Sequence, residues 1–375
     1  MSEIETVLIV GGGIAGPTLG RALHREGLTV ELIERSTEWR AEGGGIAVQP
    51  NGIRVLRTLG LDGAVERSGQ PLRRWSFCDE AGEILSENDL EALWGDVGPF
   101  IGIERTRLQR ILVAGVEGVR CRLGTFVLGM SQHDDRVSVA FSDGSFGNYD
   151  LVVGADGITS AVRSLAFDAI APSYTGAMAW RSVAPIRPRG LAGLQFLLGE
   201  DCFFGLCPVG EGRTYGFGNI TAPRTHEPMV GRLNRLRGCF AAFGGIVQEY
   251  LAALESDEQI HCAPVDWIAL DRWHASRVVL VGDAAHASSP MMGQGGCMAM
   301  EDACVLAETL CRSATLAEAL TTYELRRRPR VSWIHEESQA VAHSFRLPPP
   351  VRNDAMRQFG DQMFQHRFAP LLAAP

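Results

Sequence analysis

Apolar residues near the start of the chain occur first as a short continuous run and then at helical spacing. Residues 7–10 form the continuous run, which is typical of a strand buried on both faces. Leu19 and Leu23 follow with the four-residue spacing of a helix, and a second largely apolar run covers residues 30–35. This order predicts a strand, a helix and a second strand parallel to the first.

Alternating apolar and polar residues dominate two segments farther along. Residues 72–84 and 179–220 show this alternation with glycine and proline between short runs, which predicts antiparallel sheet. Residues 43–48 predict a flexible turn that enters a strand. We expect three further apolar runs to be strands of the same unit as the first two; they are residues 137–141, 151–153 and 278–281.

Helical spacing covers residues 50–59, which Gly60 ends, and residues 297–311. A third helix is expected from residue 316 to about 342; it is rich in arginine and other polar residues, so we expect it to be largely exposed. The prolines at 348–350 set off a final helical segment.

Composition excludes some classes of protein. With 375 residues, 46% of them hydrophobic and 21% charged, the chain can bury one large core or two modest ones. A net charge of −9 without a basic stripe argues against a nucleic-acid partner. No apolar stretch is long enough to span a membrane, so we expect a cytoplasmic protein. The nine cysteines include no C-x-x-C pair, which fits reduced thiols and predicts neither zinc nor an iron–sulfur cluster.

Three glycines directly follow the first predicted strand. Gly11 allows the tight turn, Gly13 lets backbone N–H groups approach a pyrophosphate, and Gly16 lets the following helix pack on the strand. Glu34, at the end of the second strand, accepts hydrogen bonds from both ribose hydroxyls and would repel the phosphorylated ribose of NADP. The pattern predicts an ADP-containing dinucleotide, FAD or NAD; a glycine-rich turn that binds nothing is the alternative.

Two later apolar runs also lead into a glycine and an aspartate. Residues 151–157 contain Asp156, and residues 278–286 contain Gly282 and Asp283. Because ligands bind at the carboxyl ends of strands in α/β folds, we expect both turns to reach the cofactor. Asp283 is placed to bind a polyol such as the ribityl chain of a flavin. For Asp156, an Asp-Gly turn with a purely structural role is the alternative.

Residues 293–296 form another glycine-rich stretch, directly before the helix at 297–311. Gly293, Gly295 and Gly296 leave room for the backbone to approach a planar ring, which would face the helix N-terminus. A reduced flavin carries negative charge near N1 and O2, and a helix N-terminus stabilises that charge.

In this order and spacing the three motifs resemble the single-component FAD-dependent aromatic hydroxylases, which have the para-hydroxybenzoate hydroxylase fold. Parts of the chain are similar to urate-hydroxylase-like, zeaxanthin-epoxidase-like and salicylate-hydroxylase-like members. The expected fold is α/β, with a Rossmann-type FAD-binding domain interleaved with an antiparallel-sheet substrate domain, and with C-terminal helices. The expected FAD-binding domain covers residues 1–71, 100–170 and 265–345, the substrate domain covers 72–99 and 171–264, and the C-terminal helical segment covers 346–375.

The resemblance also implies cofactor contacts. Arg105 matches the arginine at the start of a helix that reaches FAD in this family, and Arg40 lies where many members place another. Exposed arginines without a ligand are the alternative for both. The expected FAD contacts are Gly11, Gly13, Ala15, Gly16, Glu34, Arg35, Arg40, Arg105, Asp156, Gly282, Asp283, Pro290, Gly293, Gly295 and Gly296.

Substrate contacts are expected on the antiparallel sheet and the loop at Pro290. The expected catalytic residues are Arg181, Tyr215, Pro290 and Gly295, and the expected substrate contacts are Arg181, Phe203, Cys207, Tyr215, Phe217, Asn219, Met291 and Met292. Most are apolar, aromatic or soft, which favours a flat, weakly polar molecule. Core packing is the alternative for Cys207, Phe217 and Met292. Urate-type members carry an arginine where this chain has Phe203, so a urate-like anion is disfavoured. His286 either relays a proton or packs against the flavin-side loop.

The function that the resemblance implies is that of an FAD-dependent monooxygenase. FAD is held non-covalently, NADH or NADPH reduces it transiently, and O₂ supplies the oxygen that hydroxylates or epoxidises an aromatic, heteroaromatic or polyene molecule. Two alternatives stay open: a flavin oxidase or dehydrogenase without oxygen insertion, and a non-catalytic flavin-binding regulatory protein. The sequence leaves open the substrate, the choice between NADH and NADPH, and the oligomeric state.

Overall fold

A six-stranded sheet forms one half of the computed structural model, which describes residues 4–39, 44–167 and 170–375. Its strand order is β18-β19-β12-β1-β2-β8. The strands are β1 (Thr6–Val10), β2 (Thr29–Glu34), β8 (Arg120–Leu123), β12 (Leu151–Gly154), β18 (His274–Ala275) and β19 (Val278–Leu280). All neighbours are parallel except β18, which runs antiparallel to β19. Val7, Leu8 and Ile9 in the central strand are fully buried, as the continuous apolar run predicted.

A second sheet has seven strands in the order β17-β13-β16-β15-β14-β5-β6. The strands are β5 (Arg74–Asp79), β6 (Ile84–Asp89), β13 (Ser173–Ala184), β14 (Leu194–Leu198), β15 (Cys202–Gly210), β16 (Arg213–Thr221) and β17 (Ile260–Trp267). The sheet is antiparallel, as the alternation predicted, apart from the parallel pairing of β14 with β5. The two sheets are interleaved along the chain, which confirms the expected fold class; the domain limits themselves stay a prediction.

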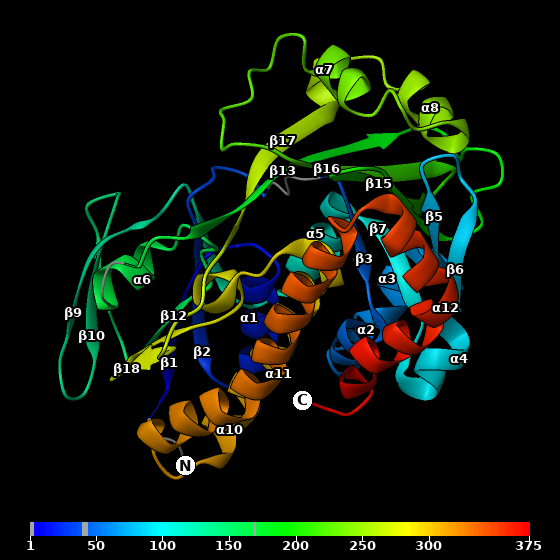
Figure 1. Ribbon diagram of the computed structural model, residues 1–375. Coiled ribbons are helices and arrows are strands. Elements are labelled where there is room, and N and C mark those ends of the chain that lie inside the picture. The colour runs from blue at the N-terminus through cyan, green and yellow to red at the C-terminus, as the bar shows by residue number, and fades with distance from the viewer. Residues whose placement is uncertain (1–3, 40–43, 168–169) are drawn as a thin grey trace.

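Alternation gives the seven-stranded sheet two different faces. Arg181 of β13 lies opposite Phe217 of β16, and Phe217 lies opposite Gly205 of β15. Tyr215 and Phe203 therefore share the face of Phe217, because successive side chains on a strand alternate. We call this the inner face. The outer face is covered by α7 (Arg232–Cys239) and α8 (Gly245–Ala252), as Figure 1 shows.

Two glycines on the outer face let the covering helices approach closely. A Cβ on Gly216 would lie 2.4 Å from the Tyr250 ring, and one on Gly218 would lie 2.2 Å from the Phe240 ring. The Tyr250 hydroxyl accepts a hydrogen bond from the Gly216 N–H at 3.0 Å and donates one to the Ser182 carbonyl at 2.9 Å. These contacts fix the sheet against its helical cover and leave the inner face for ligands.

Two smaller sheets complete the strands. One has the order β3-β7-β4 and the other β11-β10-β9. Their strands are β3 (Gly45–Val48), β4 (Gln70–Leu72), β7 (Phe100–Glu104), β9 (Val127–Gln132), β10 (Val137–Phe141) and β11 (Phe146–Tyr149). We expected residues 137–141 to be a strand of the nucleotide-binding unit; the strand is confirmed, and the domain to which it belongs stays a prediction. They form β10, whose alternating burial suits a small sheet with one solvent-facing side, whereas a strand of the parallel sheet is covered on both sides.

The remaining helices surround the sheets. They are α1 (Ala15–Arg25), α2 (Pro50–Thr58), α3 (Asp62–Ser68), α4 (Leu90–Trp94), α5 (Arg105–Ala114), α6 (Ala161–Ala166), α9 (Asp283–His286), α10 (Gly295–Arg312), α11 (Leu316–Phe345) and α12 (Pro349–Phe368), with short 3-10 helices η1 (Gly95–Val97), η2 (Asp257–Gln259), η3 (Pro290–Met292) and η4 (Ala369–Leu371). Among the described residues, none of the helices combines the length and apolarity needed to cross a membrane.

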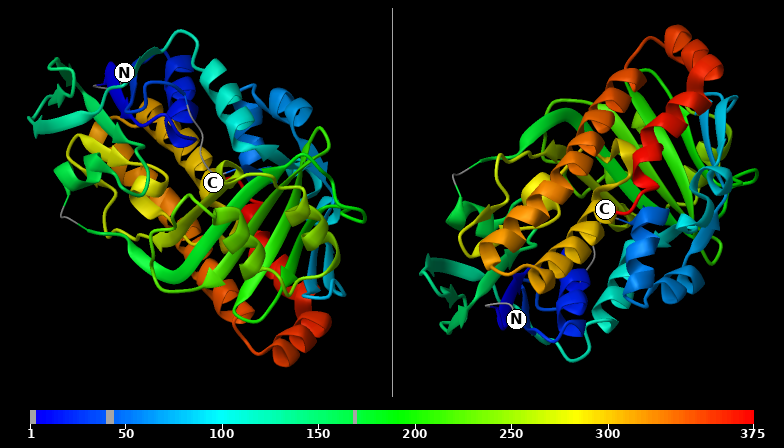
Figure 2. Two further views of the ribbon diagram at one scale, coloured as in Figure 1. Left: turned by 90° about the horizontal axis from the view of Figure 1, so that it is seen from above. Right: turned by 90° about the horizontal axis from the view of Figure 1, so that it is seen from below.

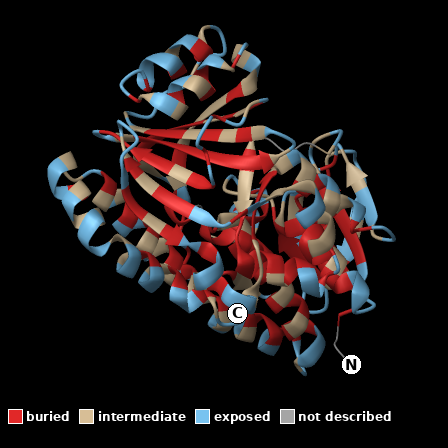
Figure 3. Ribbon diagram, turned by 90° about the vertical axis from the view of Figure 1, so that its right-hand side faces the viewer, coloured by how far each residue is buried: buried red, intermediate tan, exposed pale blue. Residues whose placement is uncertain are grey.

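The long helix α11 differs from our expectation of a largely exposed helix. One of its faces is buried, and that face includes Tyr323, Arg327 and Phe345. Figure 3 shows the same division in general: the strands are mostly buried, and exposed residues lie on the outer sides of the helices. Helix α11 runs from α10 toward the seven-stranded sheet, and α12 lies against β6 at the edge of that sheet (Figure 2).

Candidate functional site

The glycine-rich turn after β1 has the geometry that its sequence predicted. Gly11 has φ +114°, and a Cβ there would lie 2.3 Å from the Ala155 carbonyl oxygen. A Cβ on Gly16 would lie 1.9 Å from the Gly11 carbonyl oxygen, so α1 can pack here only through glycine. A Cβ on Gly13 would meet nothing within 4 Å. Helix α1 has no side-chain cap and no acidic residue in its first turn. Its N-terminus therefore faces open space with free N–H groups, and this fits a bound pyrophosphate.

Glu34 lies beside this turn, at the end of β2. Its Oε2 accepts a hydrogen bond from the Gly12 N–H at 2.7 Å, and its Oε1 accepts one from the Ser36 N–H at 2.8 Å. The carboxylate is thus held at the expected ribose position. Gln109 of α5 donates to the Gly12 carbonyl at 2.9 Å, a contact that we did not predict. Arg35 is exposed, and Arg40 lies outside the described residues.

The side chain of Asp156 stabilises the turn in which it lies and the start of the helix that follows. Its carboxylate accepts hydrogen bonds from the Ser160 hydroxyl and from the N–H groups of Ala161 and Val162, so it caps α6. Burial raises the pKa of this carboxyl, although these hydrogen bonds oppose the rise. Its backbone lies within 2.8 Å of a Cβ built on Gly11. A contact between Asp156 and FAD stays a prediction, and the backbone is the part that faces the glycine turn.

Three segments that are distant in sequence meet at the N-terminus of α10. A Cβ on Gly295 would lie 3.8 Å from Asp283 Oδ1, and Asp283 is exposed. A Cβ on Gly296 would lie 3.2 Å from Ile14 Cδ1, and one on Gly282 would lie 3.5 Å from Ala15 Cβ. Like α1, α10 begins without a side-chain cap or an acidic residue in its first turn. The predicted pyrophosphate and flavin positions are thus joined in one glycine-lined junction.

A buried amide cluster holds the loop that leads into α10. Gln294 is 1% exposed, and its amide donates to Gln49 Oε1 at 2.7 Å and accepts from Asn51 Nδ2 at 2.9 Å. Gln49 also donates to the Met292 carbonyl at 2.7 Å. These side chains point into the protein, away from the loop's open side. Our sequence reasoning missed them, because an amide has no charge that demands a partner.

Glu301 and Asp302 of α10 continue this network into a buried ion cluster. Arg327 of α11 donates to Glu301 Oε2 and to Asp302 Oδ1, each at 2.7 Å, and all three side chains are fully buried. Asp302 Oδ2 accepts from the Gly282 N–H at 2.8 Å and lies 2.6 Å from His286 Nε2. Burial by itself would raise the pKa of Asp302, but the charges of His286 and Arg327 outweigh it and lower that pKa to about 2.

The cluster also decides between the two expectations for His286. This side chain is buried, bonds to Asp302 and has its ring 4.8 Å from the ring of Trp273. It therefore packs behind the flavin-side loop and does not reach the inner face. The acidic pair in an otherwise apolar helix was the signal that an arginine must lie opposite, since a buried carboxylate needs a partner.

Tyr215 lies where the inner face meets the nucleotide-binding half. Its ring packs on Gly45 of β3, where an added Cβ would lie 2.4 Å from the ring. Burial raises the pKa of Tyr215, and the nearby charges of Arg181 and Arg105 lower it in part. The structure thus brings together Arg105, Arg181 and Tyr215, three of the residues that we expected at the site.

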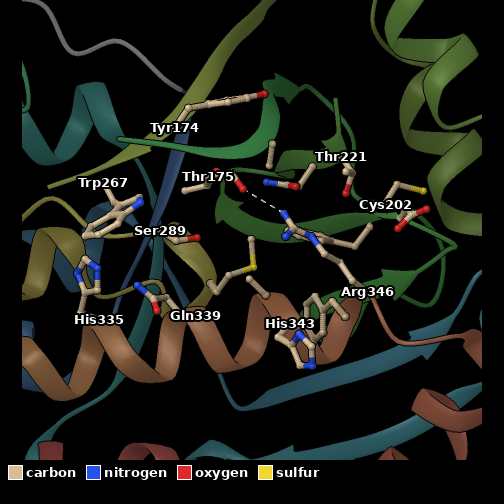
Figure 4. Close-up of a pocket in the computed structure, with 17 residues that line it drawn as sticks. Tyr174, Thr175, Cys202, Thr221, Trp267, Ser289, His335, Gln339, His343 and Arg346 are labelled. Carbon is tan, nitrogen blue, oxygen red and sulfur yellow. Dashed lines mark hydrogen bonds between the residues drawn. The ribbon is translucent and has the colours of Figure 1, made fainter. Parts of the chain in front are cut away.

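A cavity of about 280 Å³, which we call the chamber, lies between the inner face, η3 and α11. Its walls include Phe203, Asn219, Ser289, Met291, His335, Gln339 and Phe345. Figure 4 shows Trp267 and His335 side by side at one end, with ring centroids 4.8 Å apart, and Arg346 reaching the Thr175 carbonyl at 3.3 Å.

Of the expected substrate contacts, Phe203, Asn219 and Met291 line the chamber. Cys207 is fully buried, and its sulfur lies 2.9 Å from a Cβ built on Gly102 of β7, so its role is packing. Met292 is 1% exposed and packs in the core as well. Phe217 is half-buried, with its ring 5.1 Å from those of Tyr215 and Phe196. Pro290 is exposed at the start of η3.

These features define a flavoprotein with a Rossmann-type nucleotide sheet and a separate substrate sheet. The sequence profile described as "FAD binding domain" matches residues 5–338. The chain is 36% identical over 350 residues to aurachin C monooxygenase/isomerase of Stigmatella aurantiaca, covering 91% of this chain and 88% of that protein. It is 32% identical to 2-heptyl-3-hydroxy-4(1H)-quinolone synthase of Pseudomonas aeruginosa, covering 94% of each. The crystal structure of Klebsiella pneumoniae HpxO with FAD and uric acid is similar, with a TM-score of 0.89, 29% identity, and coverage of 99% of this chain and 97% of that one. The chain therefore belongs to this family of FAD-dependent monooxygenases.

We expect Gly295→Val to lose FAD and turnover while the fold persists. An added Cβ meets only Asp283 Oδ1, at 3.8 Å, so the apoprotein has room for it, but a flavin on this helix N-terminus would occupy the same space. FAD absorbance per chain and the melting temperature of the apoprotein measure the two effects. Gly16→Val is the control and should lower that melting temperature, because its Cβ would lie 1.9 Å from a carbonyl oxygen. A fully active, FAD-loaded Gly295→Val protein would contradict the assignment.

Asp302→Asn should lower the free energy of unfolding at neutral pH by about 2 kcal/mol, because the pKa of Asp302 is lowered to about 2 from an unfolded value of about 3.9. A carboxyl with a lowered pKa stabilises the native state above its unfolded pKa and loses that effect as the pH falls through its folded pKa. The difference between parent and variant should therefore shrink between about pH 4 and pH 2. Urea unfolding at several pH values measures the difference in the free energy of unfolding between parent and variant. Asp134→Asn, at an exposed position, is the control. A difference that stays constant down to pH 2 would refute the role of the charge.

Proposed function

We propose that this protein hydroxylates a flat, weakly polar heteroaromatic ring held in the chamber, with FAD as cofactor, NAD(P)H as reductant and O₂ as the oxygen source. The supporting observation is the meeting of two uncapped helix N-termini in a glycine-lined junction next to an aromatic inner face. Relatives of this chain are named aurachin C monooxygenase/isomerase, 3-amino-4-hydroxybenzoate 2-monooxygenase and FAD-dependent urate hydroxylase.

Different residues of the cofactor site would bind different parts of FAD. The α1 N-terminus at Gly13 suits the pyrophosphate, Glu34 the ribose, and Asp283 the ribityl hydroxyls. The α10 N-terminus at Gly295 would face the flavin ring and would stabilise negative charge on that ring. Bound FAD supplies electron transfer from NAD(P)H and activation of O₂, which the amino-acid side chains cannot provide.

Tyr215 and Arg181 are two polar side chains at the edge of the inner face that would bind a polar group. Because burial raises the pKa of Tyr215, its hydroxyl stays protonated at neutral pH and donates a hydrogen bond. Arg181 beside it carries a fixed positive charge. Neither side chain lines the chamber. The pair lies on the same inner face, four residues along β16 from Asn219, and would bind the flavin edge or a polar group that projects from the chamber.

The size and walls of the chamber favour a bicyclic ring. A dry cavity of roughly 150 Å³ holds benzene, so a cavity of about 280 Å³ takes about eleven non-hydrogen atoms, the size of a quinolone ring. Phe203 is 7% exposed, and its ring lies 5.4 Å from Phe196 and 5.5 Å from Phe345. An apolar wall at this position suits a neutral ring better than a urate-like anion.

Oxygen insertion separates this proposal from an oxidase or dehydrogenase. The reaction is substrate C–H plus O₂, NAD(P)H and a proton, giving C–OH, water and NAD(P)⁺. With the FAD-loaded enzyme, NADH or NADPH, ¹⁸O₂ and 2-methyl-4(1H)-quinolone, we expect one labelled oxygen in the product. Unlabelled product, or substrate oxidation with peroxide as the sole reduced oxygen species, would favour the oxidase. A cytoplasmic location stays a prediction; the nine cysteines are free, which suits a reducing compartment.

Tyr215→Phe and Arg181→Met should each lower substrate-stimulated NAD(P)H oxidation by about tenfold to a hundredfold, because each removes a hydrogen-bonding group from this edge of the inner face, a charged group in the second case. FAD content and melting temperature should stay near those of the parent. Tyr149→Phe, which removes a hydroxyl that donates to Glu31 outside the chamber, is the matched control and should keep the parent turnover. Equal losses of stability and turnover in the two test variants would show that both side chains only brace the sheet.

A further inference from the structure

A second cavity lies beside the chamber, where α12 crosses the edge of the seven-stranded sheet. Its volume is about 100 Å³. It is bounded by Trp75 and Phe77 of β5, Met291 and Met292 of η3, the end of α11, and one side of α12. We call it the side cavity. The nucleotide-binding residues do not line it.

Most side chains that line the side cavity are apolar, and the polar ones already form hydrogen bonds or ion pairs with other groups of the protein. Arg352 donates to the Gly199 and Leu198 carbonyls at 2.5 and 3.0 Å, and Arg367 donates to Glu337 at 3.1 Å. Ser86 and Ser344 likewise donate within the protein. Among the described residues, the indole N–H of Trp75 is the single lining side-chain donor that is buried without a partner. Most of the lining is apolar and few buried donors are free, so the cavity favours hydrocarbon.

The side cavity and the chamber share two side chains, which form the wall between them. Met291 and Phe345 line both cavities. The Phe345 ring lies 5.5 Å from Phe203 on the chamber side and 6.1 Å from Phe77 on the other. Met291 is an unbranched, flexible side chain that can turn aside without breaking a hydrogen bond. A molecule whose ring fills the chamber can thus extend past these two residues into the side cavity.

We propose that the side cavity binds an aliphatic tail attached to the aromatic ring, so that the substrate class is a heteroaromatic ring with an unbranched alkyl side chain. This inference rests on the proposed function for the position of the ring. A mostly apolar cavity directly adjoining the ring site, with a single buried donor that lacks a partner, favours a hydrocarbon tail over a hydroxylated one.

The volume sets the preferred length of the tail. On the same scale as benzene in roughly 150 Å³, a cavity of about 100 Å³ takes about four carbon atoms. Four of the ten methionines of the chain line it: Met291, Met292, Met356 and Met363. Because methionine adapts its shape, somewhat longer tails enter with a smaller gain for each added carbon.

The test uses 2-alkyl-4(1H)-quinolones with methyl, propyl, butyl, pentyl and heptyl tails. Titration calorimetry with the FAD-loaded enzyme gives Kd, and turnover gives KM. We expect both to fall about fourfold for each methylene up to about four carbons and to level off beyond. The heat capacity change of binding should become more negative along the series. A Kd that is independent of tail length, or that is equal for a butyl and a 3-carboxypropyl tail, overturns the inference.

Two variants locate the tail. Ala355 of α12 lines the side cavity and is half-buried, so Ala355→Phe fills it and should abolish the dependence on tail length. Met363→Ala enlarges it and should extend the fall in Kd to the heptyl tail, a gain that misfolding cannot imitate. Gln358→Phe, at an exposed position on the same helix, is the matched control and should keep the parent series. If both cavity variants keep the parent series, the tail binds elsewhere and the inference is wrong.

The two proposals fail in different ways. Binding that improves with tail length, without any labelled product, would support the tail site and refute the hydroxylation of such rings. Labelled product from every quinolone with one constant KM would support hydroxylation and refute the tail site.

Discussion

Arg327 holds the charge on which the arrangement of the flavin loop depends. Its guanidinium is fully buried and bonds to Glu301 and Asp302, and these acids in turn hold Asn51 and the Gly282 backbone. One cation thereby fixes α2, α10, α11 and the turn after β19 around the same point. Glu301 also lies 3.6 Å from Arg330, and Asp302 lies 2.6 Å from His286. Loss of one member of this cluster therefore costs less than the loss of one member of an isolated buried pair, which costs about 3–5 kcal/mol. The cluster holds the buried side of the glycine-rich loop rigidly, while the exposed side of the loop stays open for the cofactor.

Helix α11 connects this rigid side with the ligand cavities. About five turns separate Arg327 from Phe345, so both lie on the same face of the helix. Arg327 fixes the helix against the flavin loop, and Phe345 forms the shared wall of the chamber and the side cavity. The chamber wall combines polar side chains such as Asn219 and Gln339 with the rings of Phe203 and Phe345. Helix α11 thus contributes both to the support of the glycine-rich loop and to the wall of the cavities.

The local parts of the fold and of the cofactor site could be predicted from the sequence. Gly11 and Gly16 have the close backbone contacts expected of them, and Glu34 is beside the turn, because these roles depend on residues near one another in the chain. The alternating segments formed the predicted antiparallel sheet for a similar reason, since the period of two is itself the face pattern. Residues 137–141 were also predicted as a strand, but only the structure shows that this strand pairs with β9 and β11, because a strand's own pattern does not identify its neighbours.

Only the tertiary structure decided which polar residues are buried and where the cavities lie. Residues 326–328 and 330 are all arginines, and their sequence surroundings are alike. Arg326, Arg327 and Arg330 all form ion pairs with acids of α10, yet of the four only Arg327 is fully buried. The side cavity is likewise absent from any local pattern, because Trp75, Met291, Phe345 and Met363 come from four separate elements. The sequence by itself determined the cofactor class, since backbone geometry at glycines is a local property. The substrate space was decided by packing among distant elements, because a cavity is what their side chains leave unfilled.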